Sequence, residues 1–202
     1  MRHATKVLIA GLALGITGPL GAQATGMPSY NAPYRAFTRS EIGGVVSFPN
    51  GDGVAFEGVY RIAKGRFDLG FRGGMWAPGD GASSVVLLGA EGRQRVITRS
   101  QDFPLDGAVT VGIGGQLTSD VSALAIPVGL SLGRRVGPKD SSITIVPYAQ
   151  PTAVLVIDEN DTNVRFTLGL GADFKLSRNF DARISVGIGD INGLSLAAVW
   201  LR

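Results

Sequence analysis

The side chains that most often carry catalysis are nearly missing from this chain of 202 residues. Its single histidine, His3, stands at the start of the sequence, and there is no cysteine. Once the N-terminal signal described below is removed, the protein has no histidine general base, no cysteine nucleophile and no zinc or haem site built from these residues. The sequence therefore predicts a protein that is not an enzyme and uses no metal or cofactor.

Catalysis by carboxylates alone is the chemistry that this composition leaves open, because two acids can suffice for glycoside hydrolysis. Asp173 and Asp181 are the candidates, since they could approach each other across neighbouring strands. The simpler interpretation pairs them with Arg165 and Arg183 as structural charges. The acidic run at residues 158–161 lacks the spacing of a calcium-binding loop, so it predicts a solvated loop.

Three glycine motifs resemble the start of a dinucleotide-binding loop. They read VGIGG from Val111, LGLGA from Leu168 and VGIGD from Val186. In each, another residue stands where the third glycine of G-x-G-x-x-G belongs, and none opens a helix. We interpret them as a recurrent strand unit whose glycines face the inside of a barrel and permit curvature.

Apolar and polar residues alternate along much of the chain. From Val164, the even positions read Val, Phe, Leu, Leu, Ala and Phe, and the odd positions read Arg, Thr, Gly, Gly, Asp and Lys. A period of two kept for six repeats predicts a strand. Similar segments separated by Gly, Asn and Asp give about ten strands, with eight as the alternative, and no helix. The sequence thus predicts an all-β fold, an antiparallel up-and-down barrel.

Two features disturb this pattern. Residues 84–88 (SVVLL) are apolar on both faces, which predicts a bulge near Gly89. Pro127, Pro147 and Pro151 lie inside expected strands, and proline cannot donate to a strand ladder. These prolines argue against perfect closure of the barrel.

The N-terminus has the pattern of a secretory signal peptide. A basic start is followed by an apolar run and by a small-x-small ending, so we expect cleavage after Ala24. This divides the chain into a signal peptide (1–24), a lead-in (25–38) and a β-barrel (39–202). Loss of Arg2 and Lys6 leaves 17 basic and 16 acidic residues, a net charge of +1, so nucleic-acid binding is not expected.

The polar face of the expected strands is unusual, because glycines recur on it together with charges of both signs. A narrow lumen needs small residues and compensating charges, whereas a solvent-exposed face does not. The expected pairs are Glu57 with Arg61, Asp68 with Arg72, and Asp181 with Arg183. The full set of candidate lumen charges is Glu57, Arg61, Asp68, Arg72, Arg165, Asp173, Asp181 and Arg183.

Aromatic residues recur at matching ends of the expected strands, on the apolar face. They predict an interfacial girdle at the periplasmic end of a membrane barrel, formed by Tyr60, Phe67, Phe174, Phe180 and Trp200. The opposite girdle is sparse, with Phe48 and Trp76 as its best candidates.

Charge is also sorted between the two ends. The connections assigned outward are acidic, and those assigned to the periplasmic side are basic. The acids are Asp52, Asp80, Asp120, Asp158, Glu159, Asp161 and Asp190, and the bases are Lys64, Arg66, Arg134, Arg135, Lys139 and Arg178.

Over the length that follows the signal, the chain resembles small bacterial outer-membrane β-barrel proteins of eight to ten strands. The resemblance rests on the signal, the alternation and the strand ends, and Trp200 is displaced from the terminal aromatic position typical of that class. It implies a porin-like, Gram-negative outer-membrane protein in contact with lipid and with the outer-membrane assembly machinery. Enzymes of that class rely on a histidine, which the processed chain lacks.

Two functions remain open from the sequence. The first is a non-enzymatic outer-membrane barrel with a structural, narrow-channel or surface-interaction role. The alternative is a soluble secreted or periplasmic β-barrel that binds an apolar small ligand in a lumen lined by its Val, Leu and Phe faces. The sequence leaves the oligomeric state open.

Overall fold

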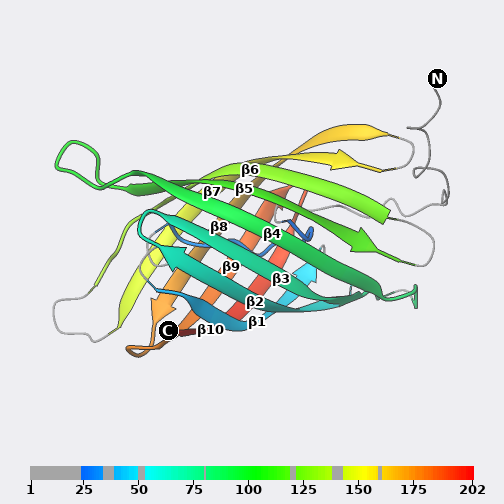
Figure 1. Cartoon of the computed structure of the whole chain (residues 1–202), viewed down its shortest axis with the longest axis horizontal. Helices are drawn as coiled ribbons and strands as arrows, with labels where there is room; N and C mark the ends of the chain where they lie inside the picture. Colours follow the sequence, from blue (N-terminus) through cyan, green and yellow to red (C-terminus); the bar gives the residue numbers. More distant parts are fainter. Residues whose placement is uncertain are drawn as a thin grey trace, which may run out of the picture.

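The computed structural model is a closed barrel of antiparallel strands, drawn lengthwise in Figure 1. It describes residues 24–33, 39–49, 53–79, 81–118, 122–137, 143–158 and 161–202. The ten strands within these residues are β1 (Glu41–Pro49), β2 (Val54–Lys64), β3 (Phe67–Ala77), β4 (Val85–Ile97), β5 (Asp106–Leu117), β6 (Ser122–Gly133), β7 (Thr144–Ile157), β8 (Thr162–Lys175), β9 (Phe180–Gly189) and β10 (Gly193–Leu201).

Each strand pairs with its neighbours in sequence, and β1 also pairs with β10, which closes the barrel. Glu41 lies opposite Arg61 of β2 on one side and opposite Leu201 of β10 on the other. The expected all-β, up-and-down barrel of ten strands is therefore confirmed, and the alternative of eight strands is wrong. The expected signal peptide lies outside the described residues, apart from Ala24, as do residues 34–38 of the lead-in.

The prolines do not prevent closure, because each one disturbs the pairing on a single side. Pairing of β5 with β6 is interrupted for two positions at Pro127, and pairing of β6 with β7 is interrupted likewise at Pro151. Pro147 lies just beyond the last pair of β6 with β7. The opposite side of each proline is continuous, where Pro127, Pro147 and Pro151 pair with Val154, Ala172 and Leu168.

The bulge expected near Gly89 is wrong, since pairing of β3 with β4 runs without a shift through this residue. The register shift of β4 lies instead between Arg95 and Ile97, on its β5 side. Residues 84–88 look apolar on both faces for another reason. Leu87 points into the barrel, fully buried, while Leu88 is half exposed on the outside.

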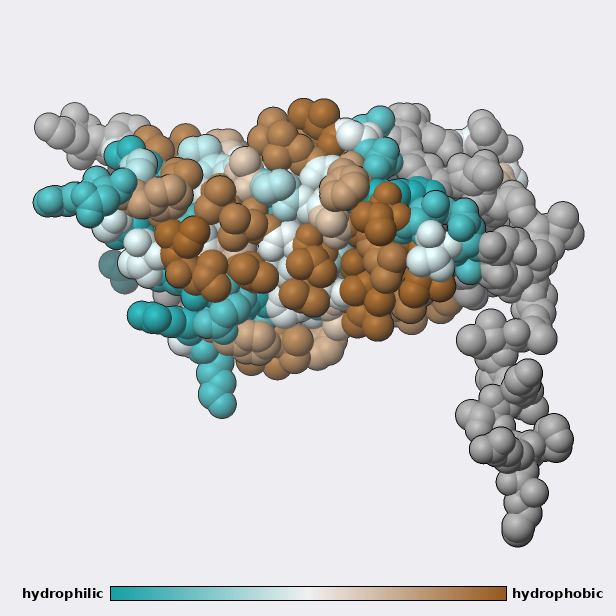
Figure 2. Space-filling model, turned by 90° about the horizontal axis from the view of Figure 1, so that it is seen from above, coloured by the Kyte–Doolittle hydropathy of each residue, from teal (hydrophilic) through white to brown (hydrophobic). Residues whose placement is uncertain are grey.

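Most of the large apolar side chains of the strands lie on the outer surface. Phe56, Ile113 and Phe166 are each more than half exposed, whereas the buried polar side chains are on the inner face. Figure 2 shows a brown apolar surface across the middle of the molecule and hydrophilic residues toward its ends. The described residues include no helix long and apolar enough to cross a membrane.

The two ends of the barrel are named here by the chain termini. The terminal end is the one where β1 begins and β10 finishes, beside the C-terminus in Figure 1, and the distal end is the other. The connections after β2, β4, β6 and β8 lie at the terminal end. Those after β1, β3, β5, β7 and β9 lie at the distal end.

Candidate functional site: the occupied lumen

The lumen of the barrel is occupied by residues 24–33, which we call the luminal segment. Met27 and Tyr30 are each only 1% exposed although they belong to no strand. Figure 1 shows the segment as a blue trace among the strands. Part of the stretch that the sequence presented as an irregular lead-in is therefore an interior element.

The segment runs along the barrel from the distal half toward the terminal end. Met27 packs with Trp76 and Leu87 from the distal halves of β3 and β4. At the other end of the segment, Pro33 lies beside Gly133, the last residue of β6 at the terminal end. The lumen is thus filled over much of its length.

Among the described residues, side chains of seven strands hydrogen-bond to the luminal segment. The Thr25 hydroxyl donates to Glu57 Oε1 at 2.7 Å, which ties the start of the segment to β2. The wall side chains that take part are Glu57, Arg93, Gln116, Ser131, Tyr148, Thr167, Arg183 and Ser185. Contacts spread over so many strands fix both the depth and the rotation of the segment.

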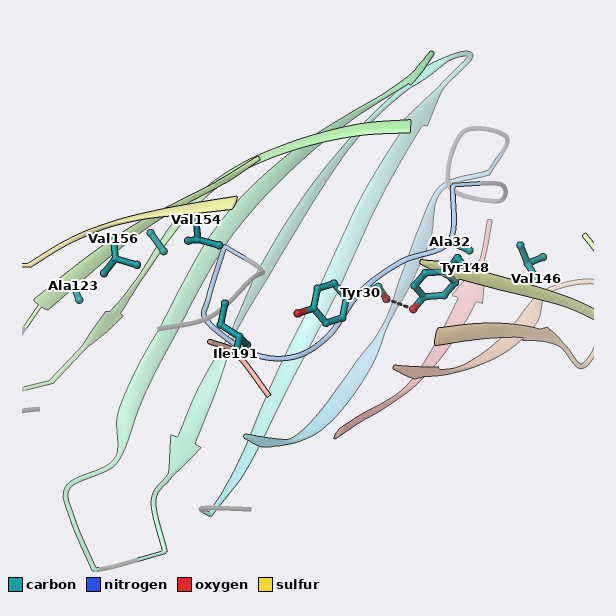
Figure 3. Packing of buried hydrophobic residues seen from close by; sticks show 9 residues of the cluster. Tyr30, Ala32, Ala123, Val146, Tyr148, Val154, Val156 and Ile191 are labelled. Carbon is teal, nitrogen blue, oxygen red and sulfur yellow. Dashed lines mark hydrogen bonds between the residues drawn. The ribbon is translucent and has the colours of Figure 1, made fainter. Parts of the chain in front are cut away.

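Tyr30 is the central anchor of the segment (Figure 3). Its backbone N–H donates to Ser185 Oγ at 3.2 Å, and its carbonyl oxygen accepts from the Tyr148 hydroxyl at 2.9 Å. Its own hydroxyl lies 3.0 Å from Thr167 Oγ1. Because every polar group of Tyr30 has a partner, its burial leaves no unsatisfied donor or acceptor.

Inward glycines make room for this anchor. A Cβ at Gly169 would lie 2.5 Å from Tyr30 Cγ and overlap the ring, and a Cβ at Gly187 would lie 3.1 Å from the Tyr30 hydroxyl. Gly89 makes room for Ala24 in the same way, since a Cβ at Gly89 would lie 2.7 Å from the Ala24 Cβ. Gly169 and Gly187 face the lumen as the sequence predicted, and they accommodate the luminal segment.

Toward the terminal end, a network of buried ion pairs links the strands. Arg61 contacts Asp68 and Glu91, the latter at 3.0 Å, and its Nε lies 3.6 Å from Glu41 Oε1. Arg93 Nε donates to Asp68 Oδ1 at 3.1 Å. These side chains are at most 9% exposed. Their charges are compensated across β1, β2, β3 and β4.

The network continues around the barrel through Arg183 of β9. Arg183 donates to both oxygens of Glu41, at 2.9 and 2.5 Å, and its Nε lies 3.3 Å from Asp173 Oδ2. It also donates to Asn31 Oδ1 of the luminal segment at 3.0 Å. One guanidinium therefore couples the closure of the barrel to the position of the segment.

Glu57 joins the wall to the start of the segment. Arg72 donates to its two oxygens at 3.0 and 2.9 Å, in addition to the hydrogen bond from Thr25. The expected partners Glu57–Arg61 and Asp68–Arg72 are wrong. Residues four apart on a strand are about 13 Å apart at roughly 3.3 Å per residue, so their partners must come from other strands.

The other predicted lumen charges also occupy inward positions. Asp181 is fully buried and lies opposite Lys175 in the register of β8 and β9, and Asp173 lies opposite Arg183. Arg165 is half-buried near the distal end of β8. Glu41, Glu91 and Arg93 were not predicted as lumen charges, although the last two keep the inward parity of β4.

The predicted aromatic girdle lies on the outside of the barrel near the terminal end. Tyr60, Phe67 and Trp200 are about half exposed, and Phe174 and Phe180 are partly exposed. The rings of Phe180 and Trp200 are 6.3 Å apart and tilted by 56°.

Of the two residues predicted for the girdle at the opposite end, Phe48 faces outward, but Trp76 does not. Trp76 is 6% exposed and contacts Met27 inside the lumen, so its assignment to a girdle is wrong. Its position shares the inward parity of Asp68 and Arg72 on β3, which the sequence could have shown.

One small cavity lies beside the luminal segment, among the described residues. A cavity of about 30 Å³ lies against Tyr30, Glu41, Arg61 and Arg183. Since one water needs roughly 10–15 Å³ by this measure, it has room for only a few waters. No group of three or more carboxylates placed to hold a metal ion occurs in the described part of the chain.

Comparison with known proteins gives structural likeness only. No family model and no curated protein matches the sequence. The β domain of the Bordetella autotransporter BrkA is 19% identical over 79% of this chain and 74% of its own, with a TM-score of 0.46. A designed transmembrane β-barrel is 14% identical over 86% and 98% (TM-score 0.38). A bacterial polysaccharide outer membrane secretin is 12% identical over 74% and 57% (TM-score 0.45).

Proposed function

We propose that this protein is a non-enzymatic outer-membrane β-barrel that forms a narrow channel closed by its own luminal segment. The observation that carries the proposal is the placement of residues 24–33. They are buried in the lumen and hydrogen-bonded by seven strands of a barrel whose outer surface is apolar.

The membrane location is supported by which face the apolar residues occupy. Side chains such as Phe56 and Phe166 are 61% and 65% exposed. Exposure of so much apolar surface to water has a large free-energy cost, which contact with lipid removes. The strands have 9 to 14 residues, and tilted strands of about 9–11 residues suffice to cross a bilayer. The aromatic residues near the terminal end would then lie at one lipid headgroup level.

The alternative function, a soluble barrel that binds an apolar ligand, is less well supported. It requires most of the large apolar side chains to line the lumen, but most of those on the strands, such as Phe56, Ile113 and Phe166, are on the outer surface. The lumen contains ion pairs and the luminal segment, and the cavity beside Tyr30 is too small for such a ligand.

The two tryptophans of the chain allow a direct test, since Trp200 faces outward and Trp76 faces the lumen. In vesicles of brominated phosphatidylcholine, the Trp76→Phe variant, which keeps Trp200, is expected to lose more than half of its fluorescence. The matched Trp200→Phe variant should lose little, because bromine quenches only rings close to lipid.

Both variants should also resist carbonate extraction and migrate differently on gels before and after boiling. Equal and weak quenching of the two tryptophans, with recovery in the soluble periplasmic fraction, would contradict the membrane location.

A further inference from the structure

The terminal end of the barrel carries an exposed ring of positive charge, which we call the basic rim. It includes Lys64, Arg66, Arg99, Arg134, Arg178 and Arg202, all exposed. Among the described residues of this end, Asp102 is the only exposed acid, because Glu41, Asp68, Asp106 and Asp181 are buried inside the barrel. The rim is therefore strongly cationic and has few neighbouring anions.

The distal end has the opposite charge. Its five connections, at residues 50–53, 78–84, 118–121, 158–161 and 190–192, include seven acids and no lysine or arginine in sequence. Of these acids, Asp161 and Asp190 are described and exposed. The exposed bases of the basic rim and the described exposed acids Asp161 and Asp190 thus lie at opposite ends of the barrel.

Apolar side chains accompany the basic rim. Phe103, Val136 and Leu176 lie in the connections of the terminal end and are 42% to 50% exposed. The outward rings of Phe67 and Trp200 lie at the same end of the barrel. A ring of bases directly above an apolar and aromatic band matches the level of a bilayer where phosphate groups meet acyl chains.

We infer that the basic rim binds the phosphate headgroups of anionic phospholipids. This inference rests on the proposed membrane location. It adds the class of lipid that is bound and the end of the barrel that binds it. Lysine and arginine at such a level attract anionic lipid by charge, and arginine also donates paired hydrogen bonds to phosphate. The acidic distal end repels the same lipids, so the two leaflets would be distinguished by charge.

Electron paramagnetic resonance with spin-labelled lipids tests this inference on the full chain reconstituted in phosphatidylcholine. The motionally restricted lipid at the barrel surface should favour labelled phosphatidylglycerol over labelled phosphatidylcholine by at least about threefold, since each nearby base contributes severalfold. The preference should disappear in about 1 M salt, where the Debye length is about 3 Å.

Two variants decide the result. Lys64→Gln, Arg66→Gln, Arg134→Gln and Arg178→Gln together should reduce the preference to near one. The control, Asp158→Asn, Asp161→Asn and Asp190→Asn at the distal end, should not reduce it. Equal association of both lipids with the unmodified chain, or an undiminished preference in the glutamine variant, overturns the inference alone. Absence of any restricted lipid overturns the proposed membrane location instead.

Discussion

Replacing Gly169 by leucine is expected to convert a closed barrel into one that conducts ions. Gly169 faces the lumen against the Tyr30 ring, and even a Cβ there would overlap it. Overpacking of a filled interior typically costs about 1–3 kcal/mol, and here the luminal segment can relieve it by leaving. Planar bilayer recordings should show discrete conductance steps for the variant and none for the unmodified chain.

The companion variants separate release of the segment from general damage. Gly58→Leu places the same side chain on an outward-facing position of β2, where a Cβ would have its nearest neighbour at 3.8 Å, so it should stay closed. Adding Tyr30→Ala to Gly169→Leu frees the space that leucine needs, so closure should be partly restored. The contradicting outcome is a Gly169→Leu variant that is folded, shows no conductance steps and keeps its luminal segment protected from added protease. The luminal segment would then not be the closing element.

Replacing Asp68 by alanine is expected to lower the free energy of unfolding by several kcal/mol, about 3–5. Asp68 is fully buried and accepts from both Arg61 and Arg93, so its removal leaves two buried guanidinium groups short of a partner. Removing one member of a buried ion pair typically costs about 3–5 kcal/mol. Urea unfolding in lipid vesicles, followed by the gel shift between folded and unfolded forms, measures this change.

The exposed Asp102→Ala provides the control and should change the free energy of unfolding by less than about 0.5 kcal/mol. A second variant, Asp68→Ala with Arg93→Met, should recover part of the loss because one uncompensated charge is removed. Equal stability of Asp68→Ala and Asp102→Ala would show that the network of ion pairs contributes nothing.

Strand positions could be predicted because their cause is local. The alternation from Val164 to Lys175 follows from one face forming the outer surface of the barrel and the other facing the lumen, and β8 spans Thr162–Lys175. The partners of each charge could not be predicted in this way. They depend on the register between neighbouring strands, which places Asp173 opposite Arg183.

The luminal segment was the least predictable part. Residues 24–33 have no periodic pattern, because they contact many different strands in turn, and no sequence period encodes that arrangement. The space for Tyr30 comes from Gly169 and Gly187, which are more than 130 residues away in sequence. Those glycines were visible as inward-facing, but what they accommodate appears only when the barrel is closed.

The presence of the segment in the lumen can be tested most directly by an introduced disulfide, because the chain has no cysteine of its own. A Cβ at Gly169 would lie 2.5 Å from Tyr30 Cγ, so Tyr30→Cys with Gly169→Cys brings the two sulfurs within bonding reach. In Tyr30→Cys with Leu170→Cys, the second cysteine points outward. Mild oxidation in native membranes should link residues 30 and 169, seen by peptide mass, and leave 30 and 170 unlinked. Linkage in neither variant, with the thiol introduced at position 30 open to a bulky maleimide, would contradict a barrel closed by its own N-terminal segment.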